Sequence, residues 1–554
     1  MQTYPAKLNK NYFLFLSASL LAAACGGRTE MFQSQRNIDF SESWRFAEDS
    51  LTVASAAAFD DAAWEFVDLP HDWSVVDFRV QDSTHVGPFQ KDLALGHDVG
   101  YLRGGTGWYR KEFMVEKENS GKRVIIHFDG VQSEMTLWVN GTEVGQHSYG
   151  YTPFFFDITP FLNEPGTKNV LAVKVYKPTQ DSRWFTGAGI YRQVSLSYLD
   201  QVHVDPWGVV VKSALKERGE AQINLVVHIN NQHESGTDIR LLAEIISVAG
   251  AIIAQSDTSV VISPLGNQSF SMTCLVQAPM LWDINNPYLY EAKISLIKDG
   301  NLIDQFIQPF GIRSIDFSAE NGFLLNGKPL ELKGACVHHD NGLLGAAAFK
   351  TAEERRVRIM KENGYNAIRT SHNPPSQFFL DACDKYGMLV IDESFDMWIK
   401  PKRPNDYHRH YEQSWQTDLE AMVKRDRNHP SVIMWSFGNE VQERADSVGV
   451  EIGKKSIAVI KSLDDTRPIT QAVCTFWDNP GKKWDDSAPA FEFLDVGGYN
   501  YLWANYESDH TKFPERIMAG TESVPMDAFE NWQLVRKASL RHWRFRLDGY
   551  GLHR

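Results

Sequence analysis

Beyond about residue 313 the chain alternates short apolar runs with amphipathic segments, and this alternation restricts its fold more than any other feature. Four amphipathic segments, 351–363, 376–386, 411–428 and 448–462, are long enough to form helices. Strands that alternate with helices predict a parallel sheet, and eight such strands close a (β/α)8 barrel. The sequence allows seven strands to be identified, at 330–337, 367–372, 388–393, 432–440, 469–473, 495–501 and 516–522.

The chain before residue 313 is predicted to be all β. Apolar and polar residues alternate there over short runs separated by turn signals, of which Asn140-Gly141 is a strong hairpin signal. We expect one β-sandwich over residues 36–202 and a second over 203–312, whose length suits an immunoglobulin-like sandwich. The predicted barrel follows at 313–535, so the fold class is multidomain β plus α/β.

Two glutamates stand at the ends of predicted barrel strands. Glu440 ends the apolar run that begins at Val432, and Glu522 ends the run that begins at Arg516. Catalytic groups of (β/α)8 barrels lie at the carboxyl ends of strands. Two carboxyl groups that face one sugar can act as general acid/base and nucleophile, as in a retaining glycosidase. The alternative for either glutamate is a structural ion pair, but two strand-end glutamates together favour catalysis.

A series of motifs in a fixed order gives the chain a family resemblance. The motifs are Leu69-Pro-His-Asp-Trp73, Gly107-Trp-Tyr-Arg110, Val139-Asn-Gly141, the segment from Ser182 to Arg192, Asn326-Gly-Lys-Pro, the segment from Lys333 to His339, that from Asn366 to Pro375, and that from His429 to Glu440. Together they resemble glycoside hydrolase family 2, and most closely its bacterial β-galactosidases. The resemblance implies a sugar-binding jelly-roll for the first sandwich and a catalytic TIM barrel.

The resemblance also implies roles for residues of the site. It makes Glu440 the general acid/base and Glu522 the nucleophile. Burial beside aromatic side chains can raise the pKa of the acid, while the nucleophile must stay ionised. The other matched positions are Asn439 for the sugar 2-hydroxyl, Tyr501 for support of the nucleophile, Arg369 and His372 for the sugar pocket and nucleophile orientation, and Trp398 as a stacking platform. A core phenol, a structural histidine and a core indole are the alternatives for Tyr501, His372 and Trp398.

No cofactor is expected. Some members of the resembled family bind magnesium near the acid/base through a Glu-x-His sequence, but here those positions hold Asp396 and Trp398. Tryptophan cannot ligate a metal, so the sequence predicts that the metal site is absent.

The predicted activity is removal of terminal β-linked galactose from a glycan, with retention of configuration. β-Glucuronidase and β-mannosidase are the alternatives within the family. Glucuronidases recognise the sugar carboxylate through an Asn-x-Lys sequence, and none follows Glu522. From another class, the chain could be a non-catalytic glycan-binding lipoprotein of the cell surface, although two retained glutamates argue against it. The sequence leaves open whether a homo-oligomer forms.

The charge and the first 25 residues indicate an exported protein. A net charge of −14 argues against binding to nucleic acid or docking to anionic lipid. Lys7 and Lys10 precede an apolar run too short to span a membrane, which is typical of a signal peptide. Small residues before Cys25 resemble a lipoprotein signal, so we expect lipidation at Cys25, with plain secretion as the alternative. A lipid anchor would be the sole membrane attachment, and would place the protein in the periplasm or on the outer membrane.

Residues 536–554 form a basic tail that we interpret as out of frame. Removing one base near the codon of Arg536 allows a frame that encodes Tyr-Val-Ile-Gly-Asp-Phe-Val-Trp, which resembles the last barrel strand of the family. We therefore expect a truncated barrel without its eighth strand, poor folding beyond about residue 313 and little activity.

Overall fold

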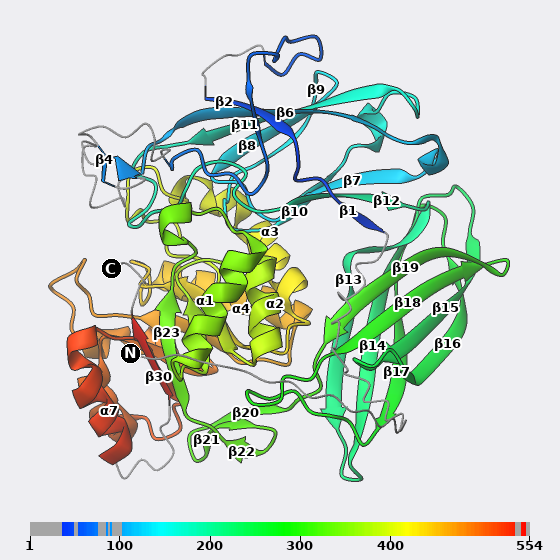
Figure 1. Ribbon diagram of the computed structural model, residues 1–554. Coiled ribbons are helices and arrows are strands. Elements are labelled where there is room, and N and C mark those ends of the chain that lie inside the picture. Colours follow the sequence, from blue (N-terminus) through cyan, green and yellow to red (C-terminus); the bar gives the residue numbers. More distant parts are fainter. Residues whose placement is uncertain are drawn as a thin grey trace, which may run out of the picture. The chain divides into compact units, whose positions relative to one another are not determined.

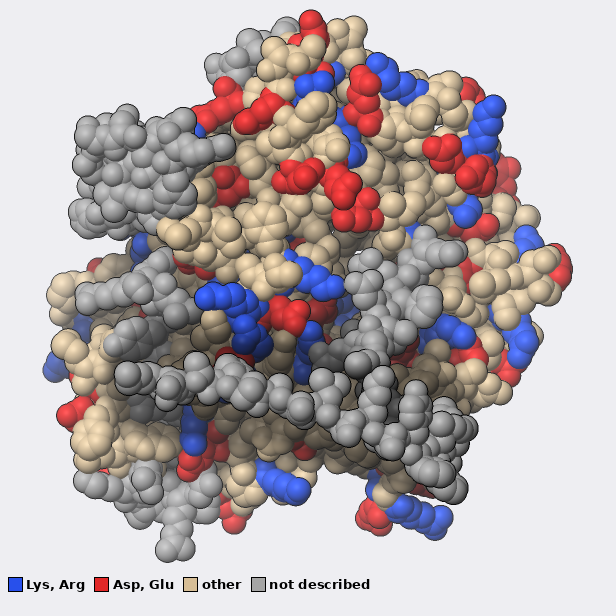
Figure 2. All heavy atoms as spheres, viewed as in Figure 1, with Lys and Arg blue, Asp and Glu red and all other residues tan. Residues whose placement is uncertain are grey.

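The computed structural model describes residues 36–48, 54–75, 85–86, 89–90, 102–537 and 545–549. Cys25 and the predicted signal peptide lie outside these residues. Among the helices that are described, none is both long and apolar enough to cross a membrane. On the face shown in Figure 2, acidic and basic side chains are interspersed among uncharged ones.

The first domain is a sandwich of two antiparallel sheets. A turn at Asn140 and Gly141, both with positive φ, joins β8 to β9, which confirms the predicted hairpin. One sheet has the order β1 (Asn37–Asp39), β12 (Val194–Leu199), β7 (Arg123–Phe128) and β10 (Phe154–Asp157). The other has the order β3 (Glu65–Val67), β2 (Trp44–Glu48), β6 (Gly105–Met114), β11 (Lys168–Lys177), β8 (Glu134–Val139) and β9 (Thr142–His147). Apolar side chains from both sheets form the core between them.

The second domain is a sandwich of seven strands, as expected for an immunoglobulin-like fold. Its strands alternate buried positions with more accessible ones, most regularly in β14, where every second residue is buried, so each sheet has one apolar face. One sheet has the order β13 (Val202–Leu215), β14 (Glu220–Asn231) and β17 (Asn267–Gln277), and the other β16 (Ile252–Ile262), β15 (Thr237–Ile246), β18 (Tyr290–Lys298) and β19 (Asn301–Phe310). Two small sheets, β4 (His85–Val86) with β5 (Phe89–Gln90) and β20 (Ile315–Ser318) with β21 (Gly322–Leu325) and β22 (Lys328–Pro329), complete the antiparallel structure that is described.

The third domain is a closed parallel barrel with helices outside it (Figure 1). The seven predicted strands and four long helices are confirmed. The barrel strands are β23 (Leu332–Val337), β24 (Ala367–Thr370), β25 (Leu389–Glu393), β26 (Val432–Asn439), β27 (Ile469–Val473), β28 (Val496–Asn500), β29 (Met518–Glu522) and β30 (Phe545–Gly549). The helices are α1 (Lys350–Glu362), α2 (Gln377–Tyr386), α3 (His408–Asp426), α4 (Ser447–Leu463), α5 (Ala488–Phe491), α6 (Tyr506–Lys512) and α7 (Ala528–Lys537).

The eighth position of the barrel, which the sequence analysis left empty, holds a short strand from the tail in the structure. β30, which comes from the tail, pairs with β23 over five residues, from Leu332 with Phe545 to Cys336 with Gly549. It meets β29 through one pair, Gly520 with Arg546. The strand occurs because Phe-Arg-Leu-Asp alternates apolar and polar residues, and because the edges of β23 and β29 present unpaired backbone groups. The hypothesis of a frame change near Arg536 stays a prediction.

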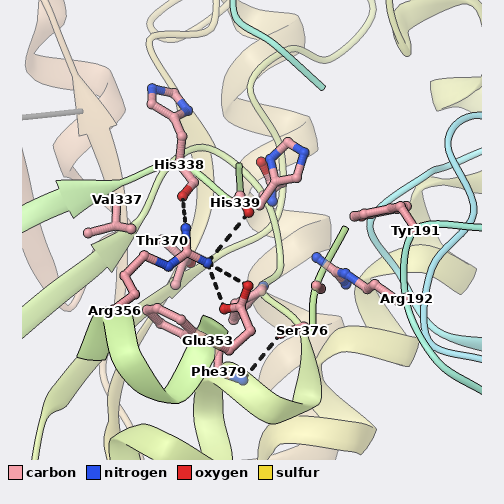
Figure 3. A pocket seen from close by; sticks show the side chains of 13 residues that line it. Tyr191, Arg192, Val337, His338, His339, Glu353, Arg356, Thr370, Ser376 and Phe379 are labelled. Carbon is pink, nitrogen blue, oxygen red and sulfur yellow. Dashed lines mark hydrogen bonds and ion pairs between the residues drawn. The ribbon is translucent and has the colours of Figure 1, made fainter. Parts of the chain in front are cut away.

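Hydrogen bonds join the first sandwich to the barrel around the pocket drawn in Figure 3. Arg192 of the sandwich donates to the carbonyl of Pro374 at 2.9 Å. On the barrel side, Arg356 of α1 pairs with Glu353 at 2.6 Å and donates to the carbonyl of His338 at 2.7 Å. These contacts tie α1 to the segment that follows β23. The pocket therefore belongs to the domain contact and is separate from the strand-end glutamates.

Candidate active site

Glu440 and Glu522 meet at the carboxyl ends of the barrel strands. Glu440 follows β26 directly and Glu522 is the last residue of β29. The side-chain amide of Asn500, at the end of β28, donates to Glu440 Oε1 at 3.1 Å and to Glu522 Oε2 at 3.2 Å. These two carboxylate oxygens are therefore no farther apart than the sum of the two distances. A single small part of a substrate can therefore contact both carboxyl groups.

The environment of Glu440 favours its protonated form. The residue is 9% exposed, and its backbone has a φ of +44°, which is uncommon for a residue other than glycine. Burial raises the pKa of Glu440, and the nearby charge of Glu522 raises it further. The cations of Lys402 and Arg183 oppose this increase without cancelling it. Glu440 can therefore hold a proton at a pH where an exposed glutamate has lost it.

The environment of Glu522 favours its ionised form. Burial alone would raise the pKa of Glu522, but contacts with His372, Arg369 and Tyr501 lower it overall. Arg369 Nη1 donates to Glu522 Oε2 at 3.1 Å, and the Tyr501 hydroxyl donates to Glu522 Oε1. Burial lowers the pKa of His372 to about 3, so its ring is neutral near pH 7. The Arg369 guanidinium is therefore the cation that stabilises this carboxylate at neutral pH.

Arg369 holds several side chains of the site in position through its hydrogen bonds. It is fully buried in β24 and donates to Glu393 at 2.7 Å and to the Asn439 side-chain oxygen at 2.8 Å, besides its bond to Glu522. Glu393 also contacts His372 Nδ1 at 2.8 Å. Because a guanidinium has five donors in a fixed plane, it can hold several acceptors in one geometry. The structure thus brings together the predicted residues Arg369, His372 and Asn439.

Trp398 lies away from the open part of the site. Its ring is fully buried, its Nε1 donates to the carbonyl of Phe437 at 3.2 Å, and the two rings stack at 5.8 Å. This burial favours core packing over the stacking platform. Tyr501, by contrast, is 44% exposed beside Glu522.

Four site residues were missed or misjudged from the sequence: Asn500, Asp396, Arg183 and Lys402. Asn500 directly precedes Tyr501 at a strand end, which is a signal that could have identified it. Asp396 was considered only as a lost metal ligand, but its carboxylate accepts from Arg183 at 2.7 Å and from Lys402 at 2.7 Å. Arg183 belongs to the first sandwich, so no local pattern places it here.

These residues do not fit a metal ion. Asp396 is paired with two cations, Arg183 and Lys402, and they hold the pKa of its carboxyl well below the usual range although burial alone would raise it. Trp398 offers no ligand atom. The prediction that no metal is bound stays a prediction.

A pocket adjoins the site between the first sandwich and the barrel. His372 and Asp396 line it from the barrel, and Tyr149, Asp181 and Trp184 line it from the sandwich. The indole of Trp184 lies 5.5 Å from the His372 ring in an edge arrangement. Aromatic faces and polar groups at such a border suit a carbohydrate, whose rings have apolar faces and polar edges.

The fold and the site define a class of protein, the multidomain proteins with a (β/α)8 barrel and paired carboxylates at the strand ends. Three family models match the chain: glycosyl hydrolases family 2, sugar binding domain, over residues 39–199; glycosyl hydrolases family 2 over 202–313; and glycosyl hydrolases family 2, TIM barrel domain, over 318–489. The chain belongs to glycosyl hydrolase family 2.

Relatives within the family differ in the activity that their names give. The chain is 36% identical to beta-galactosidase BoGH2A of Bacteroides ovatus over 90% of this chain and 60% of that protein. It is 33% identical to a putative beta-glucuronidase of Formosa agariphila over 82% of this chain and 41% of that protein. A crystal structure of a family 2 member from Bacteroides cellulosilyticus matches with a TM-score of 0.88 and 39% identity, over 93% of this chain and 64% of that one. The chain thus spans less than two thirds of these relatives.

Proposed function

We propose that the chain is a retaining exo-glycosidase that hydrolyses terminal β-galactosides. The observation that carries the mechanism is the amide of Asn500, which donates to both glutamates at 3.1 and 3.2 Å. One amide nitrogen that reaches both carboxyl groups holds them close together, whereas inverting enzymes keep theirs about 6.5–9.5 Å apart to leave room for a water molecule. A shorter separation of about 5–5.5 Å is typical of retaining enzymes.

The proposed reaction proceeds in two displacements. Glu522, as carboxylate, attacks the anomeric carbon, while Glu440 gives its proton to the glycosidic oxygen and the aglycone leaves as an alcohol. Glu440, now ionised, then removes a proton from water, which attacks the anomeric carbon and releases Glu522. The raised pKa of Glu440 and the lowered pKa of Glu522 match these two starting states.

The remaining residues of the site orient the sugar and the nucleophile. We assign Asn439 to the sugar 2-hydroxyl, because its amide lies beside Glu440 and has its oxygen fixed by Arg369. Tyr501 and Arg369 orient the Glu522 carboxylate through their hydrogen bonds. His372 is assigned to the sugar pocket, which it lines together with Asp396.

The choice of galactose rests on the similarity to BoGH2A, which is named a beta-galactosidase. β-Glucuronidase is the second candidate, because several relatives carry that name and because Arg183, a partly exposed cation, lies near both glutamates. Arg183 is already paired with Asp396, which favours a neutral sugar. We further propose export as a lipoprotein anchored through Cys25.

A panel of nitrophenyl β-glycosides tests the proposal. The sequence led us to expect little activity from a barrel without its eighth strand, but β30 closes the barrel in the structure. We therefore expect the 554-residue protein to hydrolyse the galactoside, and NMR of the fresh product to show the β-anomer first. Turnover of the glucuronide or mannoside without the galactoside would overturn the choice of sugar. An α-anomer as first product would overturn the retaining mechanism, and glycan binding without any turnover would support the non-catalytic alternative.

A further inference from the structure

Lys402 is a buried cation that touches the backbone beside the acid/base candidate. It lies in the segment between β25 and α3, and its side chain is 2% exposed. Its ammonium donates to Asp396 Oδ1 at 2.7 Å and to the backbone carbonyl of Asn439 at 2.8 Å. An ammonium removed from water destabilises a fold unless it is paired and hydrogen-bonded. The burial of this ammonium therefore indicates that Lys402 has a specific role in the site.

The carbonyl that Lys402 contacts belongs to the peptide bond that joins Asn439 to Glu440. The N–H of the same peptide bond, that of Glu440, donates to the carbonyl of Ala472 in β27 at 2.9 Å. Both polar groups of this peptide are therefore held from outside β26. Glu440 needs such contacts, because its φ of +44° costs free energy for a residue with a Cβ atom and persists only where the surroundings fix it.

Asp396 connects Lys402 to the side chain of Asn439. Its Oδ1 accepts from the Asn439 amide at 2.8 Å, from Lys402 at 2.7 Å and from Arg183 at 2.7 Å. With its oxygen on Arg369, the Asn439 amide is fixed at both ends. Lys402 thus holds Asn439, the residue before Glu440, in two ways. It contacts the Asn439 carbonyl directly, and it holds the Asn439 side chain through Asp396.

We propose that Lys402 is a positioning residue for the acid/base: by fixing the Asn439–Glu440 peptide and Asp396, its ammonium aims the Glu440 carboxyl at the oxygen of the leaving group. The inference rests on the proposed function, which gives Glu440 the acid's role. A general acid must lie within hydrogen-bond reach of the atom that it protonates. A displacement of about 1 Å can lower the rate about 100-fold.

The consequence is a loss that depends on the leaving group. A phenol or an alcohol leaves as a poor anion and needs the proton of Glu440, whereas dinitrophenolate leaves without it. A displaced Glu440 carboxyl therefore slows the cleavage of phenyl glycosides and leaves the rate on dinitrophenyl glycosides nearly unchanged. A general loss of folded protein, or of sugar binding, lowers both rates by the same factor.

The test compares Lys402→Met with wild type on the phenyl and 2,4-dinitrophenyl β-glycosides of the sugar that wild type hydrolyses. We expect kcat/KM on the phenyl glycoside to fall about 100-fold and that on the dinitrophenyl glycoside to fall less than about threefold. Lys400→Met is the matched control, because Lys400 lies in the same segment but is half exposed and pairs with Asp446 at 2.8 Å. It should leave both values and their ratio unchanged.

Equal losses on both substrates with Lys402→Met would overturn the inference and leave the proposed function intact. If Lys402→Met does not fold, Lys402→Gln, which keeps one donor group, is assayed in the same way and judged by the same ratio. If wild type hydrolyses no glycoside, the proposed function fails by itself. Crystal structures of wild type and Lys402→Met then test the inference about Lys402. An unmoved Asn439–Glu440 peptide in the variant overturns the inference, and a displaced peptide supports it.

Discussion

Replacing Glu440 with glutamine isolates the proton that the proposed mechanism requires. Glutamine keeps a side-chain oxygen where Glu440 Oε1 accepts from Asn500 at 3.1 Å, so the hydrogen bond persists and no cavity forms. Only the titratable proton and the charge are lost. Because Glu440 is buried, water cannot readily take its place as the acid.

The expected magnitude follows from general acid catalysis, which contributes about 10²–10⁴-fold. At about 1.36 kcal/mol per tenfold, the Glu440→Gln barrier should rise by about 2.7–5.4 kcal/mol for a phenyl glycoside. For a dinitrophenyl glycoside the first step should be nearly unaffected, and the glycosyl-enzyme should accumulate because no base activates water. A burst of dinitrophenolate followed by a slow phase would show this in a stopped-flow assay.

Azide distinguishes the two glutamates by the product that it forms. In Glu440→Ala the covalent intermediate still forms on Glu522, and azide attacks it to give the β-glycosyl azide. In Glu522→Ala no intermediate forms, and azide attacks the substrate directly to give the α-glycosyl azide. NMR of the products identifies the anomer. An α-azide from Glu440→Ala, or full activity of Glu440→Gln on the phenyl glycoside, would refute the assignment.

Three further predictions follow from charges in the barrel. The pH dependence of kcat/KM should be bell-shaped: activity falls on the acid side as Glu522, whose pKa is lowered, becomes protonated, and on the alkaline side as Glu440, whose pKa is raised, loses its proton. Glu440→Gln should abolish the alkaline limb on a phenyl glycoside, whose cleavage needs the proton, and a surviving limb would contradict the assignment. EDTA should leave activity unchanged because Asp396 is paired with two cations; a loss that magnesium restores would refute this. Burial alone would lower the pKa of His429, but Asp384, together with Asp381 and Asp426, raises it to about 9 from about 6.5. The contribution of the His429–Asp384 pair to stability is therefore complete below about pH 6.5 and is lost as the pH rises through about 9. The difference in Tm between wild type and His429→Gln should shrink over that range, and a constant difference would exclude this origin.

The sequence predicted the strands of the barrel well because hydrophobic periodicity is a local property. β26, for example, is buried along its whole length, and its apolar run was visible without any structure. The position of Glu440 and Glu522 at strand ends then followed from the geometry of barrels. A local pattern of this kind places a residue on an element and at one end of it.

Partners across the fold could not be predicted in that way. Arg183 and Asp396 are 213 positions apart, and Arg183 lies in a loop of another domain, where periodicity carries no information. The burial of Trp398 was also undetermined, because an indole after a strand suits either a core or a sugar platform. β30 was missed for a different reason: four alternating residues within a basic tail are too short to stand out, and the unpaired edges that they pair with are known only from the barrel.

The buried charges of the site form one connected network, and their arrangement explains why a costly set of ions is present at all. From Arg183 the contacts run through Asp396 to Asn439 and Arg369, and Arg369 holds Glu522. Replacing buried ions with apolar side chains often leaves a fold as stable or more so, which means that stability alone does not account for them. The positions of these ions relative to the two glutamates account for their presence. Arg369 lies against Glu522 and keeps it ionised, whereas the cations near Glu440 are held by Asp396 and only moderate a raised pKa. Because Arg183 comes from the first sandwich, one of the two cations that balance Asp396 would be missing from the barrel alone. The sandwich is therefore part of the electrostatic environment of the proposed acid/base, and the site is complete only where the two domains meet.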